Sequence, residues 1–428
     1  MSEKFDAIVV GAGPAGSATA KTLAEKGVDV LLVERGTDAG SKNMTGGILY
    51  SQVANRVFPE FWKDAPLERP ITCYNTVLLD SKASVNISLD ALRFSEAPYN
   101  AFSVLRVKLD KWMAEKAEKA GCTLITDATV DELMVEKGRV VGIKSGADEI
   151  QSDIVIDAEG ARAMLLKKAG LRDQISPKDV SIGVKELIQL PEDTINQRFN
   201  IRKDEGSVYT MVGNTKSISG GGFIVTNTST VSTGFVLGMN SLIDKQVKIS
   251  EFIEEYRSHP FISKLIEDGE IIEYSAGLVH EGGYEKIPKL YGDGFLVCGA
   301  AAGLNLNNFF NLRGMDLALV SGEVAALTAV KALKDKDTSA SSLRGYEPML
   351  NSMHVLDEME SFRRVPYLFG NQRLFSGYPK LVCNTFEELY EVTPNPSRKL
   401  RDLVMSEINQ NVGVTELLMD FVEVYRSL

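Results

Sequence analysis

Cysteine and histidine are scarce in this chain of 428 residues, which contains four cysteines and three histidines. The cysteines are scattered and include no C-x-x-C pair, which argues against a disulfide framework, a zinc site, a redox dithiol and a cysteine-held iron–sulfur cluster. The histidines are equally dispersed, so the sequence predicts no metal site and no acid–base pair built from them. These residues are Cys73, Cys122, Cys298, Cys383, His259, His280 and His354.

Long hydrophobic runs and clusters of basic residues are also missing. No apolar run approaches the roughly 20 residues that span a bilayer, and the charged start of the chain lacks the apolar region of a signal peptide. The net charge of -11 argues against non-specific binding of nucleic acid. With 44% apolar residues, the chain can form a large core and two or three structural units. We therefore expect a cytoplasmic protein, soluble or peripherally attached to a membrane, with no nucleic-acid partner.

The most specific pattern lies near the N-terminus. The apolar run Ala7–Val10 is typical of a buried parallel strand, and it leads directly into Gly11–Gly16, a G-x-G-x-x-G. A helix is expected from Ser17 to Lys26 and a second strand from Val28 to Val33, with Glu34 at its end. Strand, glycine turn, helix and acid stand in the order that a dinucleotide-binding fingerprint requires.

Each part of this pattern has a physical task. Gly11 allows the tight turn, Gly13 lets the backbone approach a pyrophosphate, and Gly16 lets helix and strand pack closely. The N-terminus of the helix offers free N–H groups to the phosphates, and Glu34 can accept hydrogen bonds from a ribose diol. An ordinary strand–turn–helix is the alternative for the glycines alone. The motif does not by itself distinguish NAD from FAD.

Two further segments have the character of a ligand-binding region. The loop from Arg35 to Gly47 is rich in small residues, and Lys42, Asn43 and Thr45 offer donors, although a surface loop has the same composition. A helix is expected from Ser103 to Ala120. Arg106 falls in its first turn, where it opposes the helix dipole, so either a nearby phosphate or flavin or simple solvation must stabilise it.

Two more glycine-containing turns follow apolar strands further along the chain. The strand at 150–156 ends in Asp157–Arg162, which contains Gly160, and the strand at 294–297 ends in Cys298–Gly303. Three such turns indicate one extended ligand crossing one edge of a sheet, which favours FAD over NAD. A second G-x-G-x-x-G is absent from the middle of the chain, so no separate nicotinamide domain is expected.

The fold class that these patterns predict is α/β. We expect a Rossmann-like FAD-binding domain, an inserted and mostly antiparallel β-sheet domain, and a C-terminal helical region. The FAD-binding domain would comprise residues 1–75, 101–175 and 288–337. The inserted domain would comprise 76–100 and 176–287, and the helical region 338–428.

Several motifs together resemble the FixC-type relatives of electron transfer flavoprotein:quinone oxidoreductase, within the wider fold of flavin hydroxylases and geranylgeranyl reductases. The resemblance covers essentially the full chain. The motifs that carry it are Gly11–Gly16 with Glu34–Gly36, Lys42–Gly47, Val104–Arg106, Gly183–Leu187, Glu281–Gly283, Ile287–Leu290, Arg313–Ala318 and Leu374–Pro379.

The resemblance implies an enzyme whose chemistry belongs to FAD, with no catalytic side chain of its own. Electrons would come from an electron transfer flavoprotein with alpha and beta subunits and pass to a quinone at the inner face of the cell membrane, in a Fix/Etf-type complex whose ability to bifurcate electrons stays open. Larger relatives carry a C-terminal iron–sulfur module, so here a small ferredoxin-like iron–sulfur subunit would dock near the helical tail. The inserted domain would then receive the quinone or another substrate.

Residues for both ligands follow from the motifs and the resemblance together. Gly46 and Gly47 would pass close to the flavin ring, and the N–H groups around Gly314 and Met315 would stabilise negative charge on it. The expected FAD-binding residues are Gly11, Gly13, Pro14, Ala15, Gly16, Glu34, Arg35, Lys42, Thr45, Gly46, Gly47, Arg106, Val130, Gly160, Gly299, Ala300, Gly314 and Met315. Candidates for an apolar quinone path are Phe309, Phe310, Tyr367, Leu368 and Phe369, for which a place in the core is the alternative.

One residue departs from the wider fold. Ala300 stands where most members have an acid that holds a ribityl hydroxyl, so FAD would lose a charge-assisted hydrogen bond worth roughly 1.5–3 kcal/mol. Weaker or rearranged FAD binding is the favoured interpretation, and a ligand-free relative is the alternative. For function, the alternatives are an isoprenoid (geranylgeranyl) reductase, an NAD(P)H-dependent flavin hydroxylase, and a non-catalytic scaffold subunit that FAD stabilises.

Overall fold

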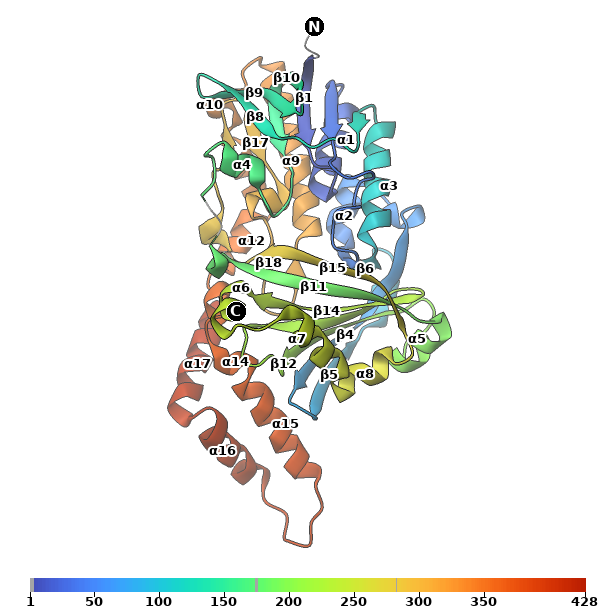
Figure 1. Cartoon of the computed structure of the whole chain (residues 1–428), viewed down its shortest axis with the longest axis vertical. Helices are drawn as coiled ribbons and strands as arrows, with labels where there is room; N and C mark the ends of the chain where they lie inside the picture. Colours follow the sequence, from blue (N-terminus) through green and yellow to red (C-terminus); the bar gives the residue numbers. More distant parts are fainter. Residues whose placement is uncertain (1–3, 174–175, 282) are drawn as a thin grey trace. The chain divides into compact units, whose positions relative to one another are not determined.

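The computed structural model describes residues 4–173, 176–281 and 283–428 (Figure 1). Gly282 of the Glu281–Gly283 motif lies outside the described residues, and so does residue 175, where one segment of the FAD-binding domain is expected to end. The chain forms two compact units. The first comprises Met1–Leu67, Val104–Asp179 and Gly282–Arg363, and the second comprises Glu68–Ser103, Val180–Glu281 and Arg364–Leu428.

The first unit is built on a parallel sheet with strand order β17-β10-β1-β2-β7. Strands β2 and β17 are buried throughout, and β1 and β10 are buried over their last four residues, as expected for a parallel sheet covered by helices. Strand β7, at the edge of the sheet, is largely exposed. An antiparallel strand, β16, extends the sheet beyond β17, and a hairpin of β8 and β9 pairs with the start of β10. The strands are β1 Lys4–Val10, β2 Val30–Val33, β7 Thr123–Ile125, β8 Glu132–Glu136, β9 Arg139–Ser145, β10 Asp148–Asp157, β16 Tyr291–Gly292 and β17 Phe295–Val297.

The pairing register aligns the carboxyl ends of the parallel strands. Val10 is paired with both Val33 and Asp157, Asp157 with Val297, and Val33 with Ile125. The segments that follow these residues must therefore emerge at the same edge of the sheet. Ligands of open α/β sheets bind at this edge.

Three long helices pack beside this sheet: α1 (Pro14–Glu25), α3 (Arg106–Lys119) and α9 (Met315–Lys334). Helices α1 and α9 approach closely at Gly322, whose carbonyl accepts a hydrogen bond from Thr19 Oγ1 at 3.1 Å. The remaining elements of the unit are short. They are β3 Gly47–Tyr50, α2 Ser51–Val57, η1 Phe61–Lys63, α4 Met164–Lys168, η3 Pro177–Asp179, η4 Tyr284–Lys286, η5 Gly299–Ala302, β18 Leu306–Asn307, β19 Leu312–Arg313, α10 Ala340–Leu343, α11 Tyr346–Ser352 and α12 Leu356–Ser361.

The second unit contains a sheet with strand order β15-β11-β14-β13-β12-β4-β6, in which β5 also pairs with β4. The pairing is antiparallel from β15 to β12 and parallel between β12 and β4. The expected mostly antiparallel sheet is therefore confirmed. The strands are β4 Leu67–Leu79, β5 Ser84–Asp90, β6 Ala101–Val104, β11 Val180–Gln189, β12 Gly206–Gly213, β13 Gly220–Thr226, β14 Thr230–Gly238 and β15 Glu270–His280.

Short helices form a core against this second sheet. Val184 and Phe235 of the sheet belong to one buried cluster with Phe252 and Ile262 of the helices. Apolar residues at helical spacing in each short helix account for this packing. The helices are α5 Glu192–Phe199, α6 Met239–Lys245, α7 Ile249–Ser258 and α8 Pro260–Ile266, and η2 spans Leu92–Ser95.

The C-terminal segment of the second unit is helical, as the sequence predicts. Helices α15 and α16 lie side by side as a hairpin, and α17 contacts both α16 and α13 (Figure 1). The five helices are α13 Val365–Leu368, α14 Gln372–Phe375, α15 Gly377–Tyr390, α16 Leu400–Asn411 and α17 Val414–Ser427. Residues 338–363, expected in the helical region, lie in the first unit.

The helix expected from Ser103 to Ala120 begins later than the sequence indicates. Ser103 and Val104 end strand β6, and α3 begins at Arg106. The hydroxyl of Ser103 accepts a hydrogen bond from the backbone N–H of Arg69 at 3.1 Å, so it serves a neighbouring strand rather than capping a helix. Tertiary pairing has decided this boundary, because the residues from 101 to 104 are all buried.

Candidate functional site

The glycine turn after β1, Gly11–Gly16, is called here the phosphate turn. Gly11 has φ +97°, and a Cβ there would lie 2.6 Å from the Ala158 carbonyl oxygen. A Cβ on Gly16 would collide with the carbonyl oxygen of Gly11. Gly13 differs, because its nearest neighbour would be Nη2 of Arg106 at 3.8 Å. Gly11 and Gly16 are thus needed by the fold, whereas a Cβ on Gly13 would make only an ordinary contact with Arg106. Gly13 precedes α1, and helix N-termini of this kind bind diphosphates.

Glu34 lies beside this turn at the end of β2, and it is buried. One carboxylate oxygen accepts the backbone N–H of Ala12 at 2.9 Å, and the other accepts that of Gly36 at 2.7 Å. Each oxygen keeps a further acceptor site, so the carboxylate can still bind a ribose diol. The loop that contains Val130 reaches the same place, since the N–H of Ala128 donates to the Glu34 carbonyl at 3.0 Å.

Arg106, the first residue of α3, is the cation nearest to Gly13. Its guanidinium donates two hydrogen bonds of 2.7 and 2.6 Å to the buried carboxylate of Asp110, which also accepts from Asn43 at 2.8 Å. Burial by itself would lower the pKa of Arg106, but the charge of Asp110 raises it overall. The ion pair therefore stabilises this cation in the first turn of a helix, and it ties the loop after β2 to α3.

The segment at 40–47 brings two expected flavin contacts together. Thr45 is buried, and its Oγ1 has no hydrogen-bond partner among the residues that the structure describes. Buried hydroxyls are normally hydrogen-bonded, so this atom fits a polar ligand. At Gly47 an added Cβ would lie 2.9 Å from Cε of Met315, which is the first residue of α9. Gly314 caps this helix without a side-chain hydrogen bond, so the N–H groups of its first turn remain available to a ligand.

The turns after β10 and β17 are joined to each other. The N–H of Cys298 donates to the carbonyl of Asp157 at 3.0 Å, and Arg172 donates to the carbonyl of Ala301 at 2.6 Å. Gly160 has φ +88°, and a Cβ there would meet no atom within 4 Å among the described residues. Ala300 lies in this region as a partly exposed methyl group.

The register therefore places most of the expected FAD-binding residues at one edge of the first unit. Four features together fit an extended dinucleotide: the unclashed position of Gly13 before α1, the available oxygens of Glu34, the orphaned hydroxyl of Thr45 and the uncapped start of α9. Arg35 and Lys42 are exposed. The assignment of individual residues to FAD contacts stays a prediction.

The proposed quinone path is divided between the two units. Phe309 is partly buried and Phe310 is 63% exposed in the first unit. In the second unit Tyr367 is 60% exposed and Phe369 partly buried, but Leu368 is fully buried and offers no surface there. The path stays a prediction.

Three residues of this region were not found from the sequence. Asp110 could have been recognised, because it lies four positions after Arg106 and such pairs meet on one helix face. Arg172 and Ser321 give no local signal. They reach the turn after β17 through the fold, with Ser321 accepting the N–H of Gly299 at 2.9 Å.

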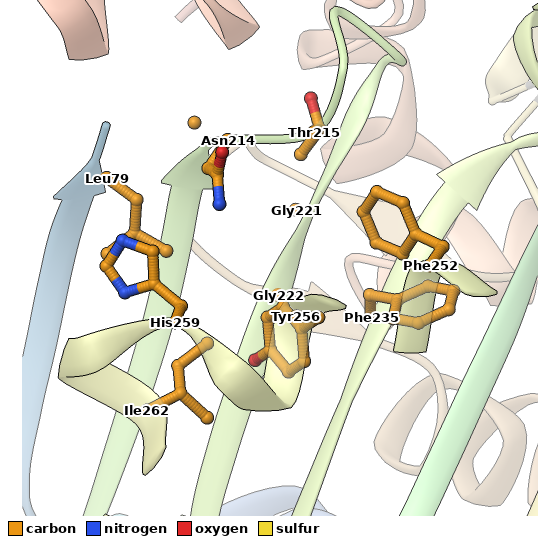
Figure 2. A pocket seen from close by; sticks show the side chains of 11 residues that line it. Leu79, Asn214, Thr215, Gly221, Gly222, Phe235, Phe252, Tyr256, His259 and Ile262 are labelled. Carbon is orange, nitrogen blue, oxygen red and sulfur yellow. The ribbon is translucent and has the colours of Figure 1, made fainter. Parts of the chain in front are cut away.

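The second unit has a separate pocket between its sheet and helices α7 and α8 (Figure 2). His259 lines it, but both ring nitrogens are engaged. Nε2 bonds to the carbonyl of Asp80 at 2.7 Å, and Nδ1 accepts the N–H of Phe261 at 3.1 Å. Other lining residues, including Phe252 and Tyr256, belong to the core. The pocket is thus built from structural contacts.

Metal-holding clusters and membrane-spanning helices are both absent from the part of the chain that the structure describes. Within residues 4–173, 176–281 and 283–428, no group of three or more His, Cys, Asp or Glu side chains is arranged to hold a metal ion. Over the same ranges, no helix has the length and apolar character needed to cross a membrane.

Two known protein families match this chain, one over its N-terminal half and one at its C-terminal end. Residues 4–218 match the FAD binding domain family, and residues 365–428 match the ETF-QO/FixC family C-terminal domain. The chain is 38% identical over 422 residues to a probable electron transfer flavoprotein-quinone oxidoreductase, YdiS, of Escherichia coli K12, and 39% identical over 422 residues to Protein FixC of the same strain, with 98% of each chain covered. Protein FixC of Azorhizobium caulinodans is 38% identical over 94% of each chain.

Solved structures with the same fold are more distant in sequence. A geranylgeranyl bacteriochlorophyll reductase-like protein from Thermoplasma acidophilum superposes with a TM-score of 0.73 at 19% identity, over 99% of this chain and 100% of that one. The flavin-dependent brominase Bmp2 superposes with a TM-score of 0.63 at 18% identity, over 89% of this chain and 92% of that one. These likenesses confirm the α/β flavoprotein fold. The sequence matches go further: the chain belongs to the ETF-QO/FixC family of FAD-dependent oxidoreductases.

Proposed function

We propose that this chain transfers electrons from an electron transfer flavoprotein to a membrane quinone, as the quinone-reducing subunit of a Fix/Etf-type complex. The observation that carries the proposal is identity of 38–39% over 98% of the chain to YdiS and FixC. Matching of the C-terminal 365–428 segment to the ETF-QO/FixC family supports it, because this segment lies outside the FAD binding domain match.

Bound FAD supplies the electron chemistry, since its ring accepts one or two electrons. The chain's own residues would bind and orient it. The phosphate turn and Arg106 would hold the diphosphate, and Glu34 the adenosine ribose. The N-terminus of α9, beginning at Met315, would place its partial positive charge near the ring and favour negative charge there.

Attachment to the inner face of the cell membrane would use apolar side chains rather than a spanning helix. The exposed rings of Phe310 and Tyr367 are candidates, one in each unit. Exposed aromatic rings are suited to the boundary between lipid and water. The quinone would enter at such a surface.

The helical tail supports the proposed docking of a ferredoxin-like subunit. Helix α17 buries its polar side, where the carboxylate of Asp420 accepts hydrogen bonds from Asn371, Arg373 and Tyr378 at 2.6–2.8 Å. Most of its exposed residues are large and apolar, which is unusual for a surface helix. Large exposed apolar surfaces mark sites of interaction. The exposed polar residues are Thr415, Glu423 and Arg426, and the exposed large apolar residues are Val414, Leu418, Met419, Phe421, Val422 and Tyr425.

Anaerobic stopped-flow spectroscopy of the FAD absorbance tests the proposal. The holoprotein is mixed with NAD(P)H alone or with reduced electron transfer flavoprotein, and a short-tailed quinone follows. We expect bleaching by the flavoprotein and rapid recovery with quinone. Bleaching by NAD(P)H alone would overturn the proposal and move the chain to the hydroxylase or reductase class.

The alternatives predict other outcomes of the same measurement. An isoprenoid reductase would be reoxidised by a polyprenyl substrate instead of quinone, and the likeness to a geranylgeranyl reductase-like structure supports only a shared fold. A scaffold subunit would assemble with its partners but show no change of FAD absorbance. Assembly with quinone-linked turnover favours the proposed electron transfer over the isoprenoid reductase, the flavin hydroxylase and the scaffold subunit.

A further inference from the structure

Two acids, Asp157 and Glu159, lie in the turn after β10, at the edge where FAD binds. The backbone of this turn is fixed on both sides. The N–H of Ala158 donates to the carbonyl of Val10 at 2.9 Å, directly before the phosphate turn, and the N–H of Cys298 donates to the carbonyl of Asp157 at 3.0 Å. A negative charge on either acid therefore lies close to the phosphate turn and to the turn after β17.

Asp157 is only 2% exposed. Its Oδ1 accepts the backbone N–H of Glu159 at 2.9 Å, but Oδ2 has no hydrogen-bond donor among the described residues. The nearby cation, Arg172, donates to the Ala301 carbonyl at 2.6 Å. Burying a carboxylate with an unsatisfied oxygen is costly, so the group favours its neutral form.

The side chain of Glu159 provides a partner for that neutral form. Burial, followed by the charge of Glu159, raises the pKa of Asp157 well above its ordinary value, and the two carboxyl groups are within hydrogen-bonding range. Two ionised carboxylates can only accept hydrogen bonds. A proton on Asp157 makes it a donor to Glu159, whose other contact is the backbone N–H of Leu165 at 2.7 Å.

We propose that Asp157 and Glu159 hold one proton between them when FAD is bound, and that this acid pair is a positioning element that keeps the wall of the FAD site free of excess negative charge. With the proton, the single charge of the pair is balanced by Arg172. Without it, a further negative charge lies next to the site of the FAD diphosphate. The proposal depends on FAD binding and not on the identity of the electron donor or acceptor.

Other titratable groups around the pair leave this balance intact. The positive charges of Arg172 and Lys167 both attract the carboxylate of Glu159. The charge of Arg172 also favours the ionised form of Asp157. On the β17 side, burial raises the pKa of Cys298 to about 12, so its thiol is uncharged at neutral pH. The shared proton is thus the component of this cluster that is expected to be lost as the pH rises.

The test is the rate at which the full-length holoprotein releases FAD, followed by flavin fluorescence after dilution, from about pH 6 to about pH 9. We expect release to accelerate roughly tenfold over this range, the ratio that corresponds to one pKa unit of coupling. Asp157→Asn should release FAD slowly at every pH, because its amide donates to Glu159 without titrating. Asp153→Asn is the matched control and should behave as wild type, because Asp153 is a half-exposed acid on the same strand that pairs with Lys4.

A flat profile in the wild type would overturn the proposal, and so would an Asp157→Asn profile as steep as that of the wild type. If Asp157→Asn does not retain FAD, Glu159→Gln takes its place, since the amide oxygen can still accept the N–H of Leu165. Infrared spectroscopy adds an independent readout. The wild-type holoprotein should show the C=O stretch of a buried protonated acid, and this band should be missing from Asp157→Asn; its presence in both proteins would contradict the assignment.

Discussion

Gly13 and Arg106 are close neighbours, because Nη2 of the arginine would lie 3.8 Å from a Cβ added to the glycine. One residue comes from the turn after the first strand and the other from the start of α3, more than ninety residues later in the chain. Their arrangement puts a cation beside the N-terminus of α1. An anionic group of the size of a phosphate is the natural occupant of such a place.

The glycines of the phosphate turn should separate folding from cofactor binding. Gly13→Ala adds a methyl group that contacts Arg106 without a clash, so we expect a normally folded protein. The methyl group would stand where the backbone must approach the pyrophosphate, so we expect little or no bound FAD. Gly16→Ala forces a collision with the Gly11 carbonyl and should lower the stability of the apoprotein as well. Thermal unfolding and the ratio of flavin to protein absorbance measure the two effects. Equal flavin content in Gly13→Ala and wild type would contradict the assignment of this turn.

Replacing Arg106 should be costly even without FAD. In Arg106→Met the buried carboxylate of Asp110 loses its ion-pair partner, and breaking such a pair costs about 3–5 kcal/mol. Urea unfolding of the apoprotein gives this value. The double variant Arg106→Met with Asp110→Leu should recover much of it, and Lys111→Met, which removes an exposed ion pair, should change little. A loss in Arg106→Met no larger than in Lys111→Met would argue against the buried pair.

Thr45 should affect the holoprotein alone. Thr45→Val removes a hydroxyl that has no partner among the described residues, so the apoprotein should keep its stability. If that hydroxyl bonds to FAD, the affinity for FAD falls about fivefold, the effect of one ordinary hydrogen bond. Thr45→Ser keeps the hydroxyl and is the control. Titration of apoprotein with FAD, followed by flavin fluorescence, distinguishes the variants; identical affinities would place the hydroxyl away from FAD.

Arg69 should be essential to the second unit. It is 1% exposed, and it donates hydrogen bonds to several backbone carbonyls. Arg69→Met leaves these acceptors buried without donors and should lower the free energy of unfolding by at least about 3 kcal/mol. Arg202→Met, an exposed arginine nearby, should change it by less than about 0.5 kcal/mol. Chemical denaturation measures both, and similar losses would contradict the role of Arg69. Its acceptors are the carbonyls of Arg202, Lys203, Glu205, Asn227 and Thr228.

Acid should loosen the attachment of α17. Hydrogen bonding from Arg373 lowers the pKa of Asp420 below its unfolded value of 3.8. Because the folded pKa is depressed, the stabilisation is present above pH 3.8 and is lost as the pH falls through the folded pKa. We expect Asp420→Asn to be less stable than wild type near neutrality, with a difference that shrinks toward acid. Thermal unfolding over a pH series measures it. A constant difference would show that Asp420 does not titrate as the ion pair requires.

Features set by neighbours in the sequence could be predicted, and features set by residues far apart in the chain could not. The strand–turn–helix at Ala7–Lys26 and the antiparallel sheet after residue 180 follow local periodicity, and both are present. Helix α3 does not begin at Ser103, where the sequence predicts its start, because strand pairing holds that residue in β6. Arg172 and Ser321 carry no local pattern, and they meet the turn after β17 only through tertiary packing.

The sequence by itself determined the dinucleotide fingerprint, the fold class and the family, because glycine spacing, apolar periodicity and shared motifs are properties of the chain. Only the tertiary structure decided which residues of the turns are neighbours and which are buried. It aligned Val10, Asp157 and Val297 in one row, enclosed Asp157 beside Glu159, and left the Oγ1 of Thr45 without a partner among the described residues. Burial and hydrogen-bond satisfaction depend on neighbours far apart in the chain, and these neighbours exist only once the strands have paired.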